Sequence, residues 1–197
     1  MYLLSILLFS ISSNLDNLIV GMSYGIKKIC IPISANLLVA FITFTGTALS
    51  MIFGKSLANY IPIEVSNAIG AVMIIGIGAA SLIKYFRHRK NNQNDESPCS
   101  LKEPEKYDKN KNNRIELREA ISLGIALSIN NIGLGIGASI SGLHIVPAAI
   151  GAFVCSLIFI SVGNLLGNSL LSKFIEKYSE PIASFGIIAL GIYQLIF

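Results

Sequence analysis

The chain has 197 residues, of which 53% are hydrophobic and 13% are charged, and its formal net charge is +4 at pH 7. So many apolar and so few charged side chains exclude an ordinary soluble domain and indicate an integral membrane protein embedded in a lipid bilayer. The positive charge lies in the connections between apolar segments, so we interpret it as a topology signal and not as a nucleic-acid-binding surface.

Six apolar segments are long enough to cross a bilayer as helices, which takes about 20 residues each. They predict an all-α polytopic protein with six transmembrane helices, at residues 2–25, 33–54, 65–86, 120–141, 146–170 and 181–197. The first segment has no basic region before it and no small-residue cleavage site, so we interpret it as a span rather than a cleaved signal peptide.

The basic residues predict the orientation of the chain. Fourteen of the 15 Lys and Arg residues fall in the connections after the first, third and fifth spans, and only Lys55 lies on the other side. Basic loops stay in the cytoplasm, so both termini are predicted to be extracytoplasmic. The spacing of Cys30, Cys99 and Cys155 supports neither a disulfide framework nor a thiolate metal site.

The middle of the first segment carries the polar run Ser12-Ser13-Asn14-Leu15-Asp16-Asn17. A charge at bilayer depth costs between about 2.5 and 15 kcal/mol, depending on how much water reaches it. Asp16 is the only acidic residue deep inside an apolar segment, and this cost makes it a candidate functional residue.

A second polar run repeats the first one. Residues 13–21 align with residues 127–135 at an offset of 114, which places Asp16 on Asn130 and Asn17 on Asn131. Further pairs follow at offsets between 112 and 115: Ala40 with Ala152, Gly54 with Gly167, and Gly76 with Gly191. Because each half has three spans, the halves are predicted to be inverted relative to each other, as in many secondary transporters. The predicted halves are residues 1–86 and 120–197.

Such repeats bind their substrate near the bilayer midplane, where the halves meet. The predicted transport site therefore consists of six residues, three from each half: Ser13, Asp16, Asn17, Ser128, Asn130 and Asn131. Hydroxyl groups of Thr43, Thr45, Thr47, Ser50, Ser156 and Ser161 and the amide of Asn164 are candidate neutral ligands, although a hydroxyl in a helix often bonds to its own backbone instead. The alternative is a buried hydrogen-bond network that only holds the two halves together.

The long connection, residues 87–119, contains a flexible linker followed by a pattern typical of a calcium-binding EF-hand loop. Oxygen-bearing side chains occupy loop positions 1, 3, 5, 9 and 12, and position 7 contributes a backbone carbonyl; these residues are Asp108, Asn110, Asn112, Glu116, Glu119 and Arg114. Asn113 replaces the usual Gly at position 6 and tolerates a left-handed backbone next best. The pattern predicts a cytoplasmic Ca²⁺ or Mn²⁺ site over residues 108–119. An ordinary charged linker with a helix-starting Glu is the alternative.

The two polar runs and the loop leading into the fourth span resemble the manganese efflux pump family, related to the lysine exporter superfamily. They resemble more closely its branch of sporulation membrane proteins of the YtaF type, found in endospore-forming bacteria. The resemblance covers essentially the whole chain. It implies a six-span inner-membrane protein with an inverted repeat, whose intramembrane acids take part in cation export. The family carries an acid in both halves, but this chain has Asn130 in the second half.

Two functions follow from these observations. The first is a secondary transporter exporting a divalent cation or a small solute. The second is a non-transporting component of spore formation that acts through partners. An enzyme is not expected, because the sequence has no Ser/His/Asp set, no HExxH run and no paired intramembrane Asp. Glycine-rich helices also pair two copies of a chain, so a homodimer is an open alternative.

Overall fold

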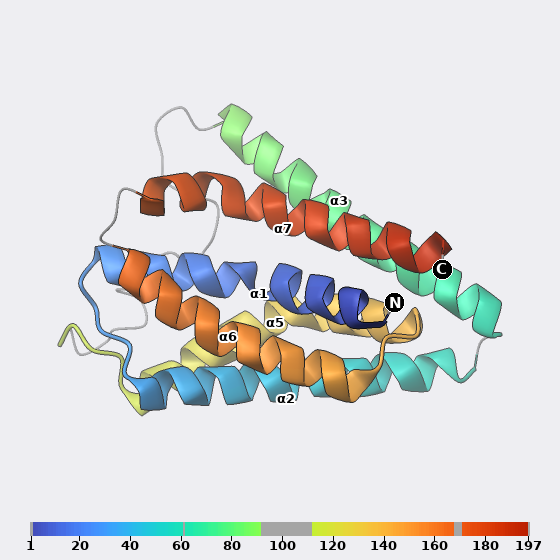
Figure 1. Ribbon diagram of the computed structural model, residues 1–197, viewed down its shortest axis with the longest axis horizontal. Helices are drawn as coiled ribbons and strands as arrows, with labels where there is room; N and C mark the ends of the chain where they lie inside the picture. Colours follow the sequence, from blue (N-terminus) through green and yellow to red (C-terminus); the bar gives the residue numbers. More distant parts are fainter. Residues whose placement is uncertain (1, 61, 92–111, 168–170, 197) are drawn as a thin grey trace.

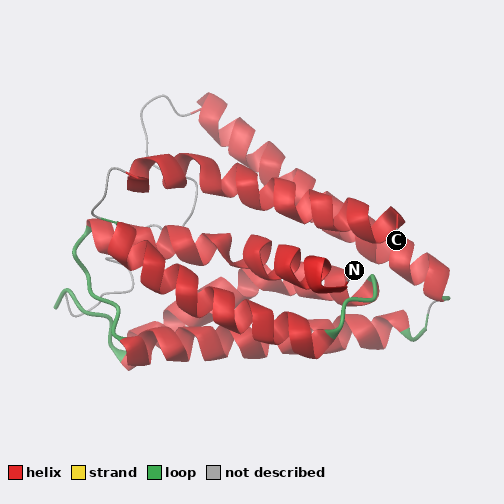
Figure 2. Cartoon of the chain, in the orientation of Figure 1, coloured by secondary structure: helices red, strands yellow, loops and turns green. Residues whose placement is uncertain are grey.

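The computed structural model describes residues 2–60, 62–91, 112–167 and 171–196, and these ranges form six helices (Figures 1 and 2). The first half holds α1 (Tyr2–Ile26), α2 (Ile33–Ala58) and α3 (Ile63–Asn91). The second half holds α5 (Leu117–Ile140), α6 (Ile145–Leu166) and α7 (Leu171–Ile196). The predicted all-α class is therefore confirmed for this part of the chain.

The last helix extends beyond its predicted apolar span. Helix α7 begins at Leu171 and contains Pro181 in its interior, while its apolar part, Pro181–Ile196, begins where the predicted span begins. The residues before Pro181 continue the helix because Leu171, Phe174, Ile175 and Tyr178 recur at helical spacing, in spite of the charges between them. Pro181 then removes a single backbone donor from a helix that already exists.

Four helical segments are long and apolar enough to cross a membrane: Leu3–Ile26, Ile33–Ala58, Val65–Arg87 and Ile145–Leu166. Helix α5 meets the same test as two segments, Leu117–Ile129 and Asn131–Ile140, inclined at 44°. In α7 the apolar part, Pro181–Ile196, is shorter. By length and composition, the described helices therefore include four or five spans, and the chain is a multi-pass membrane protein.

Each helix of the first half packs along a helix of the second half. Helix α1 lies against α6, α2 against α5, and α3 against α7. Figure 1 shows the α3–α7 pair along one side of the other four helices. The helices α1, α2, α5 and α6 therefore surround the centre of the molecule, and we call them the central helices.

Two clusters of buried apolar side chains occupy opposite ends of the bundle. The loop-side cluster lies beside the α1–α2 connection and comprises Val20, Tyr24, Ile29, Ala35, Val39, Ile115, Ala120, Leu123, Leu127 and Ile160. The terminal-side cluster comprises Phe9, Met51, Ile74, Leu134, Ala138, Leu143, Ala148, Ile187 and Leu190. In every central helix, the residues of the two clusters are separated by polar residues. These buried polar residues, the polar layer, are Ser13, Asn14, Asn17, Thr43, Thr47, Ser128, Asn131 and Ser156.

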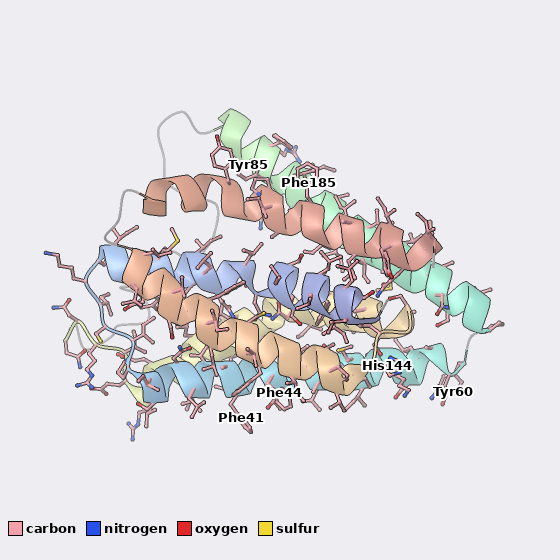
Figure 3. The ribbon with its side chains drawn as sticks, viewed as in Figure 1. Phe41, Phe44, Tyr60, Tyr85, His144 and Phe185 are labelled. Carbon is pink, nitrogen blue, oxygen red and sulfur yellow. The ribbon has the colours of Figure 1, made fainter. Side chains whose placement is uncertain are left out.

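The outside of the bundle is apolar. Phe41 on α2 and Phe185 on α7 are each 59% exposed, and Figure 3 shows both side chains on the periphery of the bundle. Large exposed aliphatic side chains also cover α1, α3, α5 and α6. A polar interior layer beneath an apolar surface is the reverse of a soluble protein and suits a lipid environment.

The C-terminal ends of α1 and α5 have the same backbone geometry. Lys28 and Gly142 both have a left-handed conformation, with φ of 59° and 90°. After α1, the N–H groups of Lys28 and Ile29 donate to the carbonyls of Gly25 and Tyr24. After α5, those of Gly142 and Leu143 donate to the carbonyls of Ser139 and Ala138. Both ends are Schellman motifs, and their equivalent residues lie 114 positions apart.

Candidate functional site

The polar layer brings together residues from both predicted polar runs. Ser13, Asn17, Ser128 and Asn131 are all buried, and Asn17 and Asn131 are only 0% and 1% exposed. Asp16 directly precedes Asn17 in α1 and is half-buried. The backbone of Asn130 belongs to α5, but its side chain lies outside what the structure describes.

A chain of hydrogen bonds crosses the layer from α1 to α6 and on to α2. The Asn14 amide donates to the Ser10 carbonyl, and the Asn17 amide donates to Asn14 Oδ1, each over 2.9 Å. The same Asn17 amide nitrogen donates to Ser156 Oγ on α6 over 2.9 Å, and Thr43 Oγ1 lies 3.4 Å from that hydroxyl. Asn14 was not assigned to the site from sequence, although its spacing of three from Asn17 places both on one helix face.

Most of the hydroxyl groups in the layer bond back to their own helix. Ser128 Oγ donates to the Ile125 carbonyl over 2.9 Å, and Thr43 Oγ1 donates to the Ala40 carbonyl over 2.9 Å. Outside the layer, on the same helix as Thr43, Ser50 Oγ donates to the Thr47 carbonyl. Such back-bonding satisfies the donor and leaves the hydroxyl lone pairs as acceptors.

Three buried oxygens of the layer have no hydrogen-bond partner within the described ranges: Asn17 Oδ1, Asn131 Oδ1 and Thr47 Oγ1. A buried acceptor left unsatisfied costs about 1–3 kcal/mol. Both N–H groups of the Asn17 amide are in use, so its carbonyl oxygen remains as a bare acceptor in the layer. Bare oxygens of this kind suit a cation or a water molecule as a ligand.

Asp16 adds a carboxylate directly before Asn17 in α1. Its Oδ1 accepts a hydrogen bond from the backbone N–H of Asn17 over 2.9 Å. This bond holds the carboxylate against α1 next to the residue whose amide reaches α6. The carboxylate and the bare Asn17 oxygen therefore come from consecutive residues.

The α1–α6 contact that positions Asn17 on Ser156 depends on glycine. A Cβ atom added to Gly21 would lie 2.5 Å from the Ile160 carbonyl oxygen, and one added to Gly25 would lie 2.3 Å from that of Asn164. From the other side, Gly163 approaches the Leu18 carbonyl and Gly167 approaches the Gly25 backbone. These glycines are therefore used within one chain, where they let two helix backbones touch.

The structure describes residues 112–119 of the predicted loop. Asn113 has a left-handed backbone there, with a φ of 57°. The Glu116 side chain and the Glu119 side chain form a reciprocal capping box at the start of α5. Asn112 donates to Glu116 Oε1 over 3.1 Å. Asp108 and Asn110 lie outside the described residues. Within residues 112–167 and the other described ranges, no three His, Cys, Asp or Glu residues form a metal cluster.

The loop is tied to the α1–α2 connection. The Cys30 N–H donates to the Asn113 carbonyl over 2.9 Å, and the Ile115 N–H donates to the Cys30 carbonyl over 3.0 Å. Ile115 is 1% exposed and belongs to the loop-side cluster. The start of α5 and the end of α1 are therefore held together at this end of the molecule.

A multi-pass helical bundle with a buried layer of amide and hydroxyl groups between two apolar clusters has the architecture of a membrane transporter. A family profile described as "Putative manganese efflux pump" matches residues 64–195. A relative from Bacillus subtilis (strain 168), "Probable sporulation protein YtaF", is 32% identical over 211 residues, covering 99% of this chain and 100% of the relative. The chain belongs to the manganese efflux pump family. No solved structure matches it. The family is one of transporters rather than enzymes.

Proposed function

We propose that the chain is a secondary transporter that exports a divalent cation resembling Mn²⁺ through the polar layer. The observation that carries this proposal is that Asn17 and Asn131, on two central helices, each have a bare, buried amide oxygen, and that Asp16 next to Asn17 in α1 adds a carboxylate. Mn²⁺ is a hard ion that prefers carboxylate and carbonyl oxygens, which is the ligand set present here. Membership of the efflux pump family supports the same direction and substrate.

The proposal includes an inverted repeat of three helices plus three. The matched Schellman motifs at Lys28 and Gly142 support it, because equivalent backbone turns recur 114 positions apart. The helix pairing also supports it, because exchanging the halves converts the α1–α6 pair into α5–α2. In this arrangement Thr43 and Ser156 face each other at the axis between the halves. The basic connections then lie in the cytoplasm, and both termini lie outside.

The charge of the site limits how transport can be coupled. One carboxylate and several neutral amides leave a divalent ion with a net charge of +1 in a region of low dielectric constant. Asn130 does not titrate, so Asp16 is the one site residue in the layer proposed to exchange a proton for the cation. We propose that the cation is exchanged against a single proton, or that the physiological substrate carries less charge than Mn²⁺.

The direct test compares the metal content of cells with and without the protein. Deletion is expected to raise the cellular manganese content and the sensitivity to added Mn²⁺, and a plasmid copy is expected to reverse both. Elemental analysis of washed cells measures the first effect. An unchanged content of every divalent metal would contradict the proposed export.

A second candidate function is a non-transporting role in spore formation. Two points favour it: the relative is described as a sporulation protein, and Asn130 stands where the family resemblance implies an acid. In this case a deletion strain would form fewer heat-resistant spores while its metal content and metal sensitivity stayed at the wild-type level. Sporulation and metal sensitivity measured on one strain therefore separate the two functions. If the relative's role applies here, the protein acts in the inner membrane of a sporulating cell.

We also propose that the segment from residue 108 to residue 119 binds Ca²⁺ or Mn²⁺ on the cytoplasmic side. The left-handed Asn113 permits the sharp central turn of such a loop, and Asn112, Glu116 and Glu119 supply oxygen atoms close together at the start of α5. Because Ile115 and Cys30 join this loop to the end of α1, an ion bound there acts on two central helices.

The full-length protein in detergent tests the loop site. Calorimetric titration with Ca²⁺ and Mn²⁺ is expected to show binding that Asp108→Ala weakens by about tenfold or more, because a charged ligand is lost. Glu105→Ala, which lies outside the 12-residue pattern, serves as the matched control. Equal titration curves for both variants would show that the loop does not bind the metal ion through Asp108, and the proposed loop site would be wrong.

A further inference from the structure

A second group of amide and hydroxyl side chains lies nearer the loop side, between α2 and α6. Asn36 stands in the first turn of α2, and Ser161 and Asn164 stand near the end of α6. The Asn36 amide donates to the Leu157 carbonyl over 3.0 Å and to Ser161 Oγ over 2.8 Å. The Asn164 amide donates to the Ile29 carbonyl in the α1–α2 connection over 3.0 Å. We call Asn36, Ser161 and Asn164 the loop-side amide group.

Within the described part of the chain, Asn36 has an amide oxygen without a hydrogen-bond partner, like Asn17 and Asn131 in the polar layer. Its side chain is 5% exposed, and its Oδ1 has no hydrogen-bond partner among the described residues. The orientation of this amide is fixed by chemistry, because the Leu157 carbonyl accepts only from an N–H group. Leaving a buried carbonyl oxygen without a hydrogen bond costs about 1–3 kcal/mol of stability. A bound ligand that is not part of the protein would remove this cost.

The loop-side amide group and the polar layer both lie along the contact between α2 and α6. Asn36 and Thr43 are seven residues apart on α2, which is two helical turns or about 10 Å on one face. On α6, Leu157 follows Ser156 directly. Between the two polar groups, Val39 and Ile160 are fully buried members of the loop-side cluster. The apolar side chains of Val39 and Ile160 therefore separate the loop-side amide group from the polar layer.

The chemistry of the group suits transient binding. It offers an amide oxygen and a hydroxyl, which replace water around a hard cation, and none of its three side chains carries a charge. A neutral oxygen set binds a cation more weakly than the central site, where Asp16 adds a full negative charge. A cation would therefore bind weakly at the loop-side amide group and more strongly near Asp16. This difference in affinity favours movement of the cation toward the polar layer.

We propose that Asn36, with Ser161 and Asn164, forms an entry site where the cation sheds part of its water before it reaches the polar layer. The entry site rests on the proposed export of a divalent cation and adds a second binding position to it. In the proposed orientation it lies at the cytoplasmic end of the bundle, where Asn164 bonds to Ile29 beside the bridge between Cys30 and Arg114.

Transport of Mn²⁺ into proteoliposomes provides the first test, using the full-length protein with its cytoplasmic side exposed to the ion. Asn36→Leu, which keeps the volume and removes the oxygen, is expected to raise the half-saturating Mn²⁺ concentration about tenfold. Asn36→Asp keeps an oxygen and adds charge, and it is expected to lower that concentration. Asn59→Leu, at the opposite end of α2, is the matched control. If both Asn36 variants raised the concentration equally, the side chain would be a structural link between helices and the proposal would be wrong.

Thiol labelling gives a second readout that does not depend on transport. In a background that carries Cys30→Ser, Cys99→Ser and Cys155→Ser, the variant Ser161→Cys keeps Asn36, and its exposed thiol is expected to react with a membrane-impermeant thiol reagent from the cytoplasmic side. Mn²⁺ is expected to slow the reaction, whereas choline chloride of equal ionic strength is not. No protection by Mn²⁺ would overturn the entry site. Protection of the cysteine variant by Mn²⁺, together with a wild-type protein that transports no Mn²⁺, would retain the binding site and refute the proposed export instead.

Discussion

Replacing Asp16 by asparagine is expected to reduce divalent-cation transport about 100-fold, because the substitution removes the one carboxylate assigned to the polar layer and leaves the ion charge uncompensated. Asparagine has nearly the same size, so the packing of α1 is preserved. Mn²⁺ uptake into proteoliposomes measures the rate, and metal sensitivity of cells carrying the variant gives the phenotype.

Two further variants show that the loss comes from charge. Asp16→Glu is expected to retain part of the activity, because it keeps the carboxylate and shifts it by one methylene group. Asn130→Asp adds the acid that the family resemblance implies in the second half, and it is expected to strengthen Mn²⁺ binding. Wild-type transport by Asp16→Asn would remove this residue from the cation pathway.

The largest structural effect is expected from Gly25. In Gly25→Ala the new Cβ atom would lie 2.3 Å from the Asn164 carbonyl oxygen and 3.0 Å from the Gly167 Cα atom. Both neighbours are backbone atoms of α6, so relief requires the two helices to separate. We expect a loss of at least about 2 kcal/mol of stability. The separation is also expected to weaken the bond between Asn17 and Ser156.

Gly76→Ala is the matched control for this experiment. No atom of the described residues lies within 4 Å of a Cβ built on Gly76, which sits in α3. Alanine favours a helix by up to about 1 kcal/mol over glycine, so this variant is expected to be as stable as the wild type or slightly more so. Thermal unfolding in detergent, followed by circular dichroism, measures both variants. Equal midpoints for the two would show that the α1–α6 contact adapts without cost.

The apolar segments were sufficient to predict the helices, because a lipid environment imposes a long hydrophobic run on every span. Helix α7 extends N-terminal to its predicted span because residues 171–180 continue the helical period, although their charges exclude them from an apolar span. The loop pattern calls for Gly at position 113, and Asn113 has the left-handed backbone that few other residue types adopt.

The sequence predicted which residues were polar and central, but it did not predict how they are partnered. Asn17 meets Ser156 because α1 packs on α6, and no local pattern specifies that pairing. Asn36 was missed for the same reason. A single asparagine near the start of an apolar helix has no periodic partner, and its significance depends on the Leu157 and Ser161 atoms that approach it from α6.

The two apolar clusters on either side of the polar layer bear on the electrical behaviour of the membrane. With both clusters packed in the described bundle, we expect no continuous file of water to join the two sides, so that an inserted protein does not short-circuit the membrane potential. In the proposed transporter, ions then cross only as the bundle rearranges, and collective helix motions take microseconds to milliseconds or longer. Flux through this protein is therefore expected to saturate at carrier rates, with no single-channel currents in a planar bilayer.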